Sequence, residues 1–449
     1  MKKFFATLKN IWMIEDLRMK ILITVGFAAI YRFGSFVVLP GINPNQLVAL
    51  REQTSEGLMS LLNMFSGGAF SNASIFALGI MPYITASIVI QLLAVAVPYF
   101  QKMQREGESG RRKINQYTRY LTIFILLFQA PGYLVNLKNM SGGALAPSIP
   151  GGWTMFMISS TIILAAGSMF ILWLGERITD KGIGNGVSMI IMLGIIARLP
   201  QAFGQEAVSR LNNLNGGGLV MFLIELVILF LVVMAAIMLT QATRKVPVQY
   251  AKRIVGNKQY GGARQYIPLK VNAANVMPII FAQALMFIPI TLAGFGARQD
   301  AGGIGGWIAR NFGDMNGFWY NVIYFLMIVA FTYFYTAITV RPTQMAEEMK
   351  KNSGFIPGIK PGKKTAEYLD SIMSRITLPG SLFLGIVAIL PAFARYFGIN
   401  QQFAQFFGGT SLLITVGVVL DTLQQIETHL MMHHYDGLMK SGKLKGRNR

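Results

Sequence analysis

NMFSGGAFSNASIFALGIMPYITASIVIQLLAVAVP, residues 63–98, is the stretch that decides the fold. Residues 75–97 are apolar and long enough to cross a bilayer as a helix, which rises about 1.5 Å per residue. The dozen residues before them are too polar and too few to cross, yet too apolar for a solvated linker, because serines and asparagines alternate with apolar side chains around Gly67 and Gly68. At membrane depth such a segment is tolerated only inside protein or beside water. The stretch therefore predicts a membrane protein with a plugged or water-lined path.

The composition of the whole chain indicates a polytopic membrane protein. Of its 449 residues, 53% are hydrophobic and 13% are charged, whereas soluble proteins carry about 25% charged residues. The absence of cysteine excludes disulfides, thiolate metal sites and cysteine nucleophiles, and the three histidines all lie near the C-terminus. We therefore expect no catalytic residue, no metal site and no cofactor.

Apolar stretches predict an all-α protein with about ten transmembrane helices, at residues 21–39, 75–97, 118–136, 154–174, 184–199, 218–240, 273–293, 319–340, 376–394 and 408–430. Ten spans divide into two halves of five, and an odd number per half gives the halves opposite topology, as in inverted-repeat transporters. No residue-level repeat supports this division, so it rests on the number of spans. Residues 1–20 indicate a cytoplasmic amphipathic helix rather than a cleavable signal, because charges interrupt their apolar run.

The distribution of charge gives the orientation. The net charge of +21 is concentrated in the loops 98–117 and 241–272 and in the tail 431–449, whereas the loops on the other side are thinly charged. Lys and Arg accumulate on the cytoplasmic side of membrane proteins. Both termini and the basic loops of this multi-pass protein are therefore predicted to be cytoplasmic.

Charged residues inside predicted spans are candidates for function. Glu225 in the sixth span and Asp421 in the tenth qualify. Glu225 lies near one end of its span, so its side chain can instead reach the interface. Asp421 has polar neighbours, which favour a hydrogen bond to an adjacent helix over proton relay. The sequence leaves both roles open.

Two glycine-rich stretches do not predict a nucleotide site. In GIKPGKKT, residues 358–365, three residues separate the glycines and Lys364 follows Lys363, whereas a P-loop needs four residues there and then Lys followed by Ser or Thr. Any energy source is therefore expected to be a partner. GERITDKGIGNG, residues 175–186, predicts a tight cytoplasmic turn in which Glu176 balances Lys181 and Arg177 balances Asp180.

The loop 241–272 is a candidate docking surface. It carries seven basic residues, no acidic residue and three tyrosines, a pattern compatible with RNA. Most of this basic pattern can be explained by the usual excess of Lys and Arg in cytoplasmic loops, which contact lipid headgroups. Charge alone does not explain the length of the loop or the β-like texture of RKVPVQY and RQYIPLKV. Together with loop 341–371, these features indicate a folded platform for a partner.

Several motifs, in order along essentially the whole chain, resemble the SecY family, the channel subunits of the bacterial protein translocon. They are NMFSGGAFSNASIFALGIMPYITASI, EGESGRRKINQYTRY, GERITDKGIGNGVS, YAKR, IPLKVN, GFIPGIKPGKKTAEYLD and FGGTSLLI.

The resemblance implies two pseudo-symmetric five-helix halves around a central pore, with residues 63–74 as a plug half-helix. It implies a first half at 21–200, an external hinge loop at 201–217, a second half at 218–430 and a basic tail at 431–449. The pore ring would comprise Ile80, Ile84, Val187, Ile191, Ile280 and Ile414. The plug would comprise Asn63, Met64, Phe65, Ser66, Gly67, Gly68, Ala69 and Phe70. The lateral gate would include Thr85, Ser87 and Gln91, and docking would involve Lys252, Arg253 and Lys360.

The function implied is passive conduction of unfolded secretory polypeptides across the bacterial cytoplasmic (inner) membrane, with lateral release of membrane segments into lipid. The implied partners are SecE, SecG, the SecA ATPase, the ribosome and precursor proteins, with SecDF, YidC and membrane lipids as further candidates. One departure from the family pattern is Lys360, where Arg is usual; lysine keeps the charge but loses the bidentate fork. The alternative from the span count is a secondary transporter of a small solute.

Overall fold

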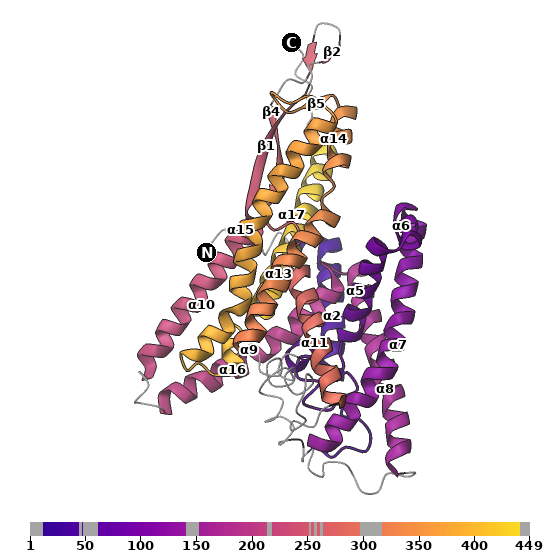
Figure 1. Ribbon diagram of the computed structural model, residues 1–449, viewed down its shortest axis with the longest axis vertical. Coiled ribbons are helices and arrows are strands. Elements are labelled where there is room, and N and C mark those ends of the chain that lie inside the picture. Colours follow the sequence, from indigo (N-terminus) through magenta and orange to yellow (C-terminus); the bar gives the residue numbers. More distant parts are fainter. Residues whose placement is uncertain are drawn as a thin grey trace. The chain divides into compact units, whose positions relative to one another are not determined.

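The computed structural model describes residues 12–44, 47, 62–140, 152–212, 218–250, 253–255, 258–260, 264–296 and 317–440 (Figure 1). The chain forms two compact units. The first comprises Met1–Gly204 and Val418–Arg449, and the second comprises Gln205–Gly417. Two long helices, α9 (Gly186–Asn212) and α17 (Gly409–Lys440), run through the unit boundaries.

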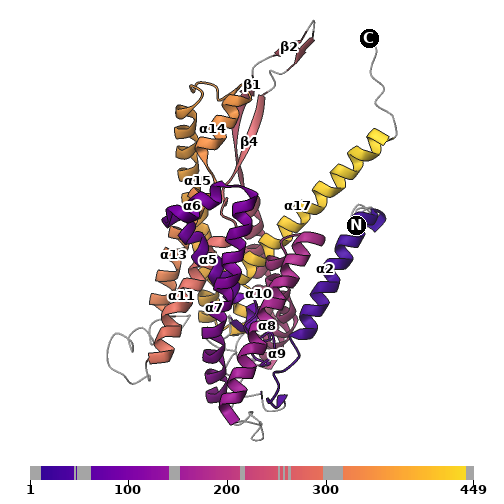
Figure 2. The same ribbon diagram turned by 90° about the vertical axis from the view of Figure 1, so that its right-hand side faces the viewer.

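The first unit is a bundle of largely apolar helices. It contains α2 (Glu15–Gly34), α5 (Met81–Ala96), α6 (Pro98–Arg105), α7 (Glu108–Met140) and α8 (Gly152–Lys181). Helix α7 packs against α5 and α8, with α6 at the end of α5 in both views (Figures 1 and 2). The chain bends by 101° between α5 and α6, because Val97 precedes a proline and is extended, with φ −109° and ψ 121°.

The second unit joins membrane helices to a small sheet. Its helices are α10 (Gly218–Gln241), α11 (Met277–Gly296), α13 (Phe318–Thr339), α14 (Pro342–Lys351), α15 (Lys363–Tyr396) and α16 (Gln401–Ala404). The strands β1 (Thr243–Tyr250), β4 (Arg264–Lys270) and β5 (Gly354–Phe355) form an antiparallel sheet in the order β4-β1-β5. Strands β2 (Arg253–Val255) and β3 (Lys258–Tyr260) form a separate hairpin. The β-like texture predicted on both sides of loop 241–272 is thereby confirmed.

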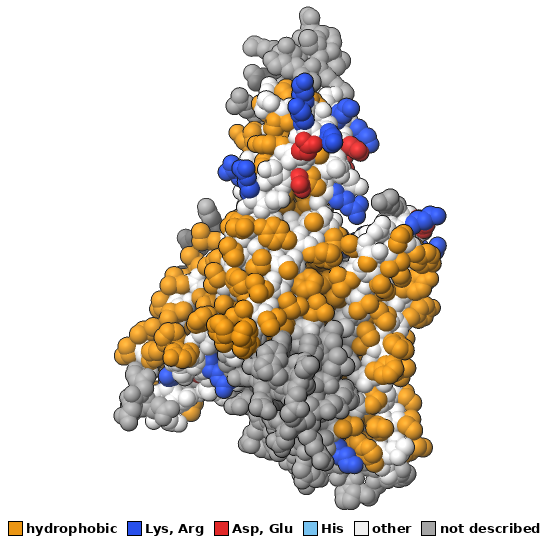
Figure 3. Space-filling view, in the orientation of Figure 1, with side chains coloured by type: hydrophobic (Ala, Val, Ile, Leu, Met, Phe, Trp, Pro, Cys, Tyr) orange, Lys and Arg blue, Asp and Glu red, His pale blue; other side chains and the backbone are white. Residues whose placement is uncertain are grey.

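A core at one end of this unit holds the sheet to the helices. Val246, Val248 and Leu269 of the sheet pack with Met349 of α14 and Leu369 of α15. Alternate residues of β1 are buried, as expected for a strand with one face on a core. Charged side chains, Lys and Arg together with some Asp and Glu, gather around this end, whereas apolar side chains cover α10 (Figure 3). The basic loops thus form a folded platform on apolar helices.

Each of the ten predicted spans contains a helix. Among the described residues, seven helices are long and apolar enough to cross a membrane, or eight when α5 and α6 count as one bent span. The two predicted stretches outside this group lie in α2 and α11. The all-helical, multi-span fold class is confirmed.

Two predicted boundaries were wrong. The second span begins at Met81 rather than at residue 75, because Pro82 occupies the first turn of α5 and residues 75–80 form turns. Residues 201–212 were predicted to belong to an external loop, but they continue α9, where Glu206 and Arg210 form an i,i+4 ion pair. Residues 213–217 lie outside the described part of the chain.

Candidate pore and plug site

The predicted plug is a chain of tight turns rather than a half-helix. Residues 62–65 form one helical turn, and turns continue to Ile80. Gly67 and Gly68 have φ values of +63° and +93°, which residues other than glycine rarely adopt. A Cβ at Gly67 would also lie 2.9 Å from the Cα of Gly194 in α9. The glycine pair therefore allows both the reversal of the chain and its close approach to α9.

The polar side chains of this segment form hydrogen bonds with its own backbone. Asn63 Oδ1 accepts from the amide of Ser71 at 3.0 Å, and Ser66 Oγ accepts from the amide of Phe70 at 3.1 Å. Ser71 Oγ donates to the carbonyl of Gly68 at 3.1 Å. Asn63, Ser66 and Ser71 are each at most 3% exposed. Burial of so polar a stretch is possible because its groups are paired internally.

The apolar side of the segment belongs to the core of the first unit. Phe70 and Ala73 pack with Tyr133 of α7 and Phe156 of α8. The rings of Phe70 and Tyr133 are 4.8 Å apart, and Tyr133 donates from its hydroxyl to the carbonyl of Phe70 at 3.0 Å. The segment is thus docked on α7 and α8 as well as folded on itself.

Two arginines that the sequence reasoning missed reach the same segment. Arg32 of α2 donates from Nη1 to the carbonyl of Gly67 at 2.8 Å. Arg198 of α9 donates from Nη2 to Ser71 Oγ at 3.2 Å. The rule that singled out Glu225 and Asp421, a charge inside a predicted span, also applies to these two residues.

The predicted ring residues divide between the units. Ile80, Ile84, Val187 and Ile191 belong to the first unit, and Ile280 and Ile414 belong to the second. Ile80 and Ile84 are buried one turn apart at the start of α5, where the amide of Ile84 donates to the carbonyl of Ile80. Ile191 is buried in α9 and Ile414 in α17, whereas Val187 and Ile280 are half-buried.

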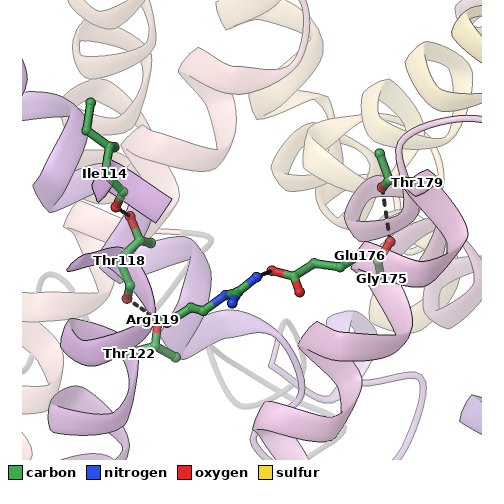
Figure 4. A network of polar contacts seen from close by, with 7 residues as sticks. All are labelled: Ile114, Thr118, Arg119, Thr122, Gly175, Glu176 and Thr179. Carbon is green, nitrogen blue, oxygen red and sulfur yellow. Dashed lines mark hydrogen bonds and ion pairs between the residues drawn. The ribbon is translucent and has the colours of Figure 1, made fainter. Parts of the chain in front are cut away.

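The start of α9 lies close against α8. A Cβ at Gly186 would come within 1.9 Å of the carbonyl oxygen of Gly175, and Gly186 donates its amide to Thr179 Oγ1 at 2.8 Å. The glycines of this stretch therefore serve helix packing, and the predicted turn at residues 175–186 was wrong in its first part, because residues 175–181 continue α8. Glu176 pairs with Arg119 of α7 at 2.6 Å, not with Lys181 as the sequence suggested (Figure 4).

The predicted gate residues take part in hydrogen bonds within α5. Thr85 donates to the carbonyl of Met81 at 3.1 Å, and Gln91 donates to Ser87 Oγ at 3.2 Å. All three predicted gate side chains are half-buried. Their polar groups therefore have partners that move with the helix.

The docking residues are only partly described. Lys252 lies outside the described residues, and Arg253 begins β2 without a described side chain. Lys360 is exposed just before α15, and its carbonyl accepts from Thr365 Oγ1 at 3.0 Å. Its ammonium group is therefore presented to the solvent beside the sheet platform.

Glu225 belongs to a buried ion cluster in the second unit. Arg210 lies 2.6 Å from Glu225 and 2.9 Å from Glu206, and it donates to the carbonyl of Gly398 at 3.0 Å. Glu206 also accepts from the amide of Asn400 at 2.9 Å. These contacts assign Glu225 a structural role rather than snorkelling. Asp421 is exposed on α17.

The described residues hold no group of three or more His, Asp or Glu side chains that could bind a metal ion. The described side chains around residues 63–84 offer hydrophobic packing and hydrogen bonds. The fold and this site define a polytopic helical membrane protein with a buried, plug-like segment.

The SecY family model matches residues 74–423. The chain is 45% identical over 444 residues to the protein translocase subunit SecY of Halalkalibacterium halodurans, covering 97% of this chain and 100% of the relative. It is 43% identical over 435 residues to that of Streptomyces coelicolor, covering 95% and 97%. The chain belongs to the SecY family.

Solved structures share the fold. The structure of a protein-conducting channel, and one that concerns the plug domain of a SecY protein, each give a TM-score of 0.61 at 18% identity over 92% of both chains. Sec61 in a canine ribosome–channel complex gives 0.57 at 18% identity, again over 92% of both chains. The chain is thus a multi-pass membrane subunit of the protein translocase, the protein-conducting channel of the Sec translocon. It is not an enzyme, and the alternative of a solute transporter falls away.

Proposed function

We propose that unfolded polypeptides pass outward through a ring formed by Ile80, Ile84, Val187, Ile191, Ile280 and Ile414. The observation that carries the proposal is the buried, internally satisfied segment that leads directly into Ile80 and α5. An aliphatic ring offers a hydrated ion no partner, and it adapts to an extended chain of any sequence.

Residues 63–70 close this path from the external side as a plug. Three helices of one unit hold the segment, through Arg32, Tyr133 and Arg198. Its hydrogen bonds within residues 63–71 join neighbours in sequence, so they can persist when the segment moves as a body. A self-contained, separately docked segment suits a closure that must leave and return.

Membrane segments leave sideways along α5, past Thr85, Ser87 and Gln91. An unsatisfied polar group facing lipid would cost several kcal/mol. Because the described bonds of these side chains lie within α5, the helix can face lipid or a signal sequence without breaking them. The helix is therefore suited to a gate surface.

The sheet platform receives the driving partner. SecA or a ribosome would bind the basic loops 241–272 and 341–371, through Lys252, Arg253 and Lys360, with SecE and SecG as fellow subunits and SecDF and YidC as further partners. The exposed Lys360 and the basic groups around α14 support this role (Figure 3). The related Sec61 structure is that of a ribosome–channel complex.

The test uses the absence of cysteine in the chain. Ile84→Cys is combined with a cysteine in a secretory precursor arrested in transit. Val89→Cys, on the same helix but 37% exposed, is the matched control. We expect a disulfide at residue 84 that requires SecA, ATP and a functional signal sequence, and none at residue 89. If neither Ile84→Cys nor Ile280→Cys crosslinks to an engaged precursor, the path lies elsewhere.

A further inference from the structure

Two guanidinium groups hold the plug turn from different helices. Arg32 of α2 bonds to the carbonyl of Gly67, and Arg198 of α9 bonds to Ser71 Oγ. The two acceptors are four residues apart in a segment, residues 63–74, that contains no charged residue. The contacts are therefore charge-assisted hydrogen bonds to neutral groups, which are stronger than neutral pairs.

The backbone of the plug is shaped around these side chains. A Cβ on Gly67 would lie 2.9 Å from Arg32 Nη1, and a Cβ on Gly68 would lie 3.2 Å from Arg198 Nη2. Ser71, the acceptor of Arg198, is 2% exposed. The Arg32 guanidinium also lies over the ring of Phe36, 5.2 Å from its centroid, which restrains the side chain near the plug. Glycine at both positions makes room for the arginines.

We propose that Arg32 and Arg198 are plug-positioning residues that form a two-point latch on the closed channel. The inference rests on the proposed function of residues 63–70 as the plug. Both acceptors, the carbonyl of Gly67 and Ser71 Oγ, belong to buried residues, so the two bonds oppose displacement of the plug. Once water or a polypeptide enters, water satisfies the same donors and acceptors, and the latch no longer holds. Opening and wetting are thereby coupled.

The experiment measures ion conductance of the purified channel in planar bilayers without precursor. Arg198→Gln and Arg32→Gln are each compared with Arg119→Gln, which removes an exposed arginine of the same unit that contacts Glu176 instead. We expect each latch variant to raise resting conductance at least about tenfold, as for loss of a hydrogen bond to a charged group. We expect no change for Arg119→Gln. If neither latch variant raises the resting conductance, the latch proposal is wrong.

A double-mutant cycle separates the latch from general damage. Ser71→Ala removes the acceptor of Arg198, so the double variant Arg198→Gln/Ser71→Ala should conduct no more than the stronger single variant. Additive effects would show that the two residues act separately, which contradicts the proposal. Translocation of a precursor with a weakened signal sequence should rise in the latch variants, whereas a damaged fold would lower it.

Deletion of residues 66–70 distinguishes failure of the latch from failure of the plug. If the deletion conducts ions and the arginine variants do not, the latch is wrong and the plug assignment stands. If the deletion itself leaves the channel tight, residues 63–70 are not the seal and both proposals fail.

Discussion

Each unit contains arginine contacts that are at least partly buried, but the acceptors differ in charge. In the first unit Arg32 and Arg198 bond to uncharged groups of residues 63–74, the segment that contains the proposed plug. In the second unit Arg210 joins two buried carboxylates, Glu206 and Glu225. Water can replace a bond to a neutral acceptor, whereas separating a buried ion pair exposes unpaired charge to a low dielectric. The contacts of Arg32 and Arg198 are therefore suited to breaking when the channel opens. The ion cluster of Arg210 is suited to staying intact.

The ion cluster also explains why α9 continues past the unit boundary. Its last turns carry Glu206 and Arg210, which bind α10 and the chain at Gly398 and Asn400. All five of these positions belong to the second unit, with Glu225 as the contact in α10. The cluster therefore makes the end of α9 part of the second unit.

The largest expected effect comes from breaking the permanent contact. Arg210→Ala leaves two carboxylates buried without their cation, which should lower the free energy of unfolding by about 3–5 kcal/mol. Arg119→Ala, which breaks an exposed pair, should cost only about 0–1 kcal/mol. Denaturant titration of the purified channel measures both. Equal losses would remove the basis for treating the two contacts differently.

The proposed ring provides the next test, because it would seal the path without any polar contact. Ile84→Gly combined with Ile280→Gly should make the resting channel leak ions in planar bilayers, since the apolar barrier to hydrated ions is widened. Val89→Gly combined with Ile280→Gly controls for loss of an aliphatic side chain from α5 outside the ring. Unchanged conductance in the first double variant would contradict the ring assignment.

The sequence predicted the elements of both units but not these contacts. Apolar runs located a helix in each of the ten predicted spans, and the β-like texture of RKVPVQY and RQYIPLKV indicated where β1 and β4 lie. The turns of residues 66–80 depend on Gly194 and on two arginines distant in sequence, so local pattern could not give them. Similarly, Glu225 was left undecided because its partner, Arg210, lay in a stretch predicted to be a loop.

The left-handed backbone at Gly67 gives a further test of how the proposed plug closes the channel. Gly67→Ala places a Cβ at a residue with φ +63° and 2.9 Å from the Cα of Gly194, so the closed turn should lose about 1–2 kcal/mol or more. The resting conductance should rise accordingly. Gly204→Ala is the matched control, since a Cβ there meets nothing within 4 Å in a helix and should be neutral or slightly stabilising. A tight channel with Gly67→Ala would show that the left-handed turn is not needed for closure.

The smallest effect is expected where the plug is held by a neutral donor. Tyr133→Phe removes only the hydroxyl that donates to the carbonyl of Phe70 and leaves the ring contact at 4.8 Å in place. A neutral hydrogen bond contributes about 1 kcal/mol, so resting conductance should rise by about fivefold, less than for loss of either arginine. The carbonyl of Phe70 still accepts from the amide of Ala73 at 3.2 Å in this variant, which keeps the expected effect small. If Tyr133→Phe leaked as strongly as Arg198→Gln, charge would not distinguish the contacts that hold the plug, and closure would depend on the number of hydrogen bonds instead.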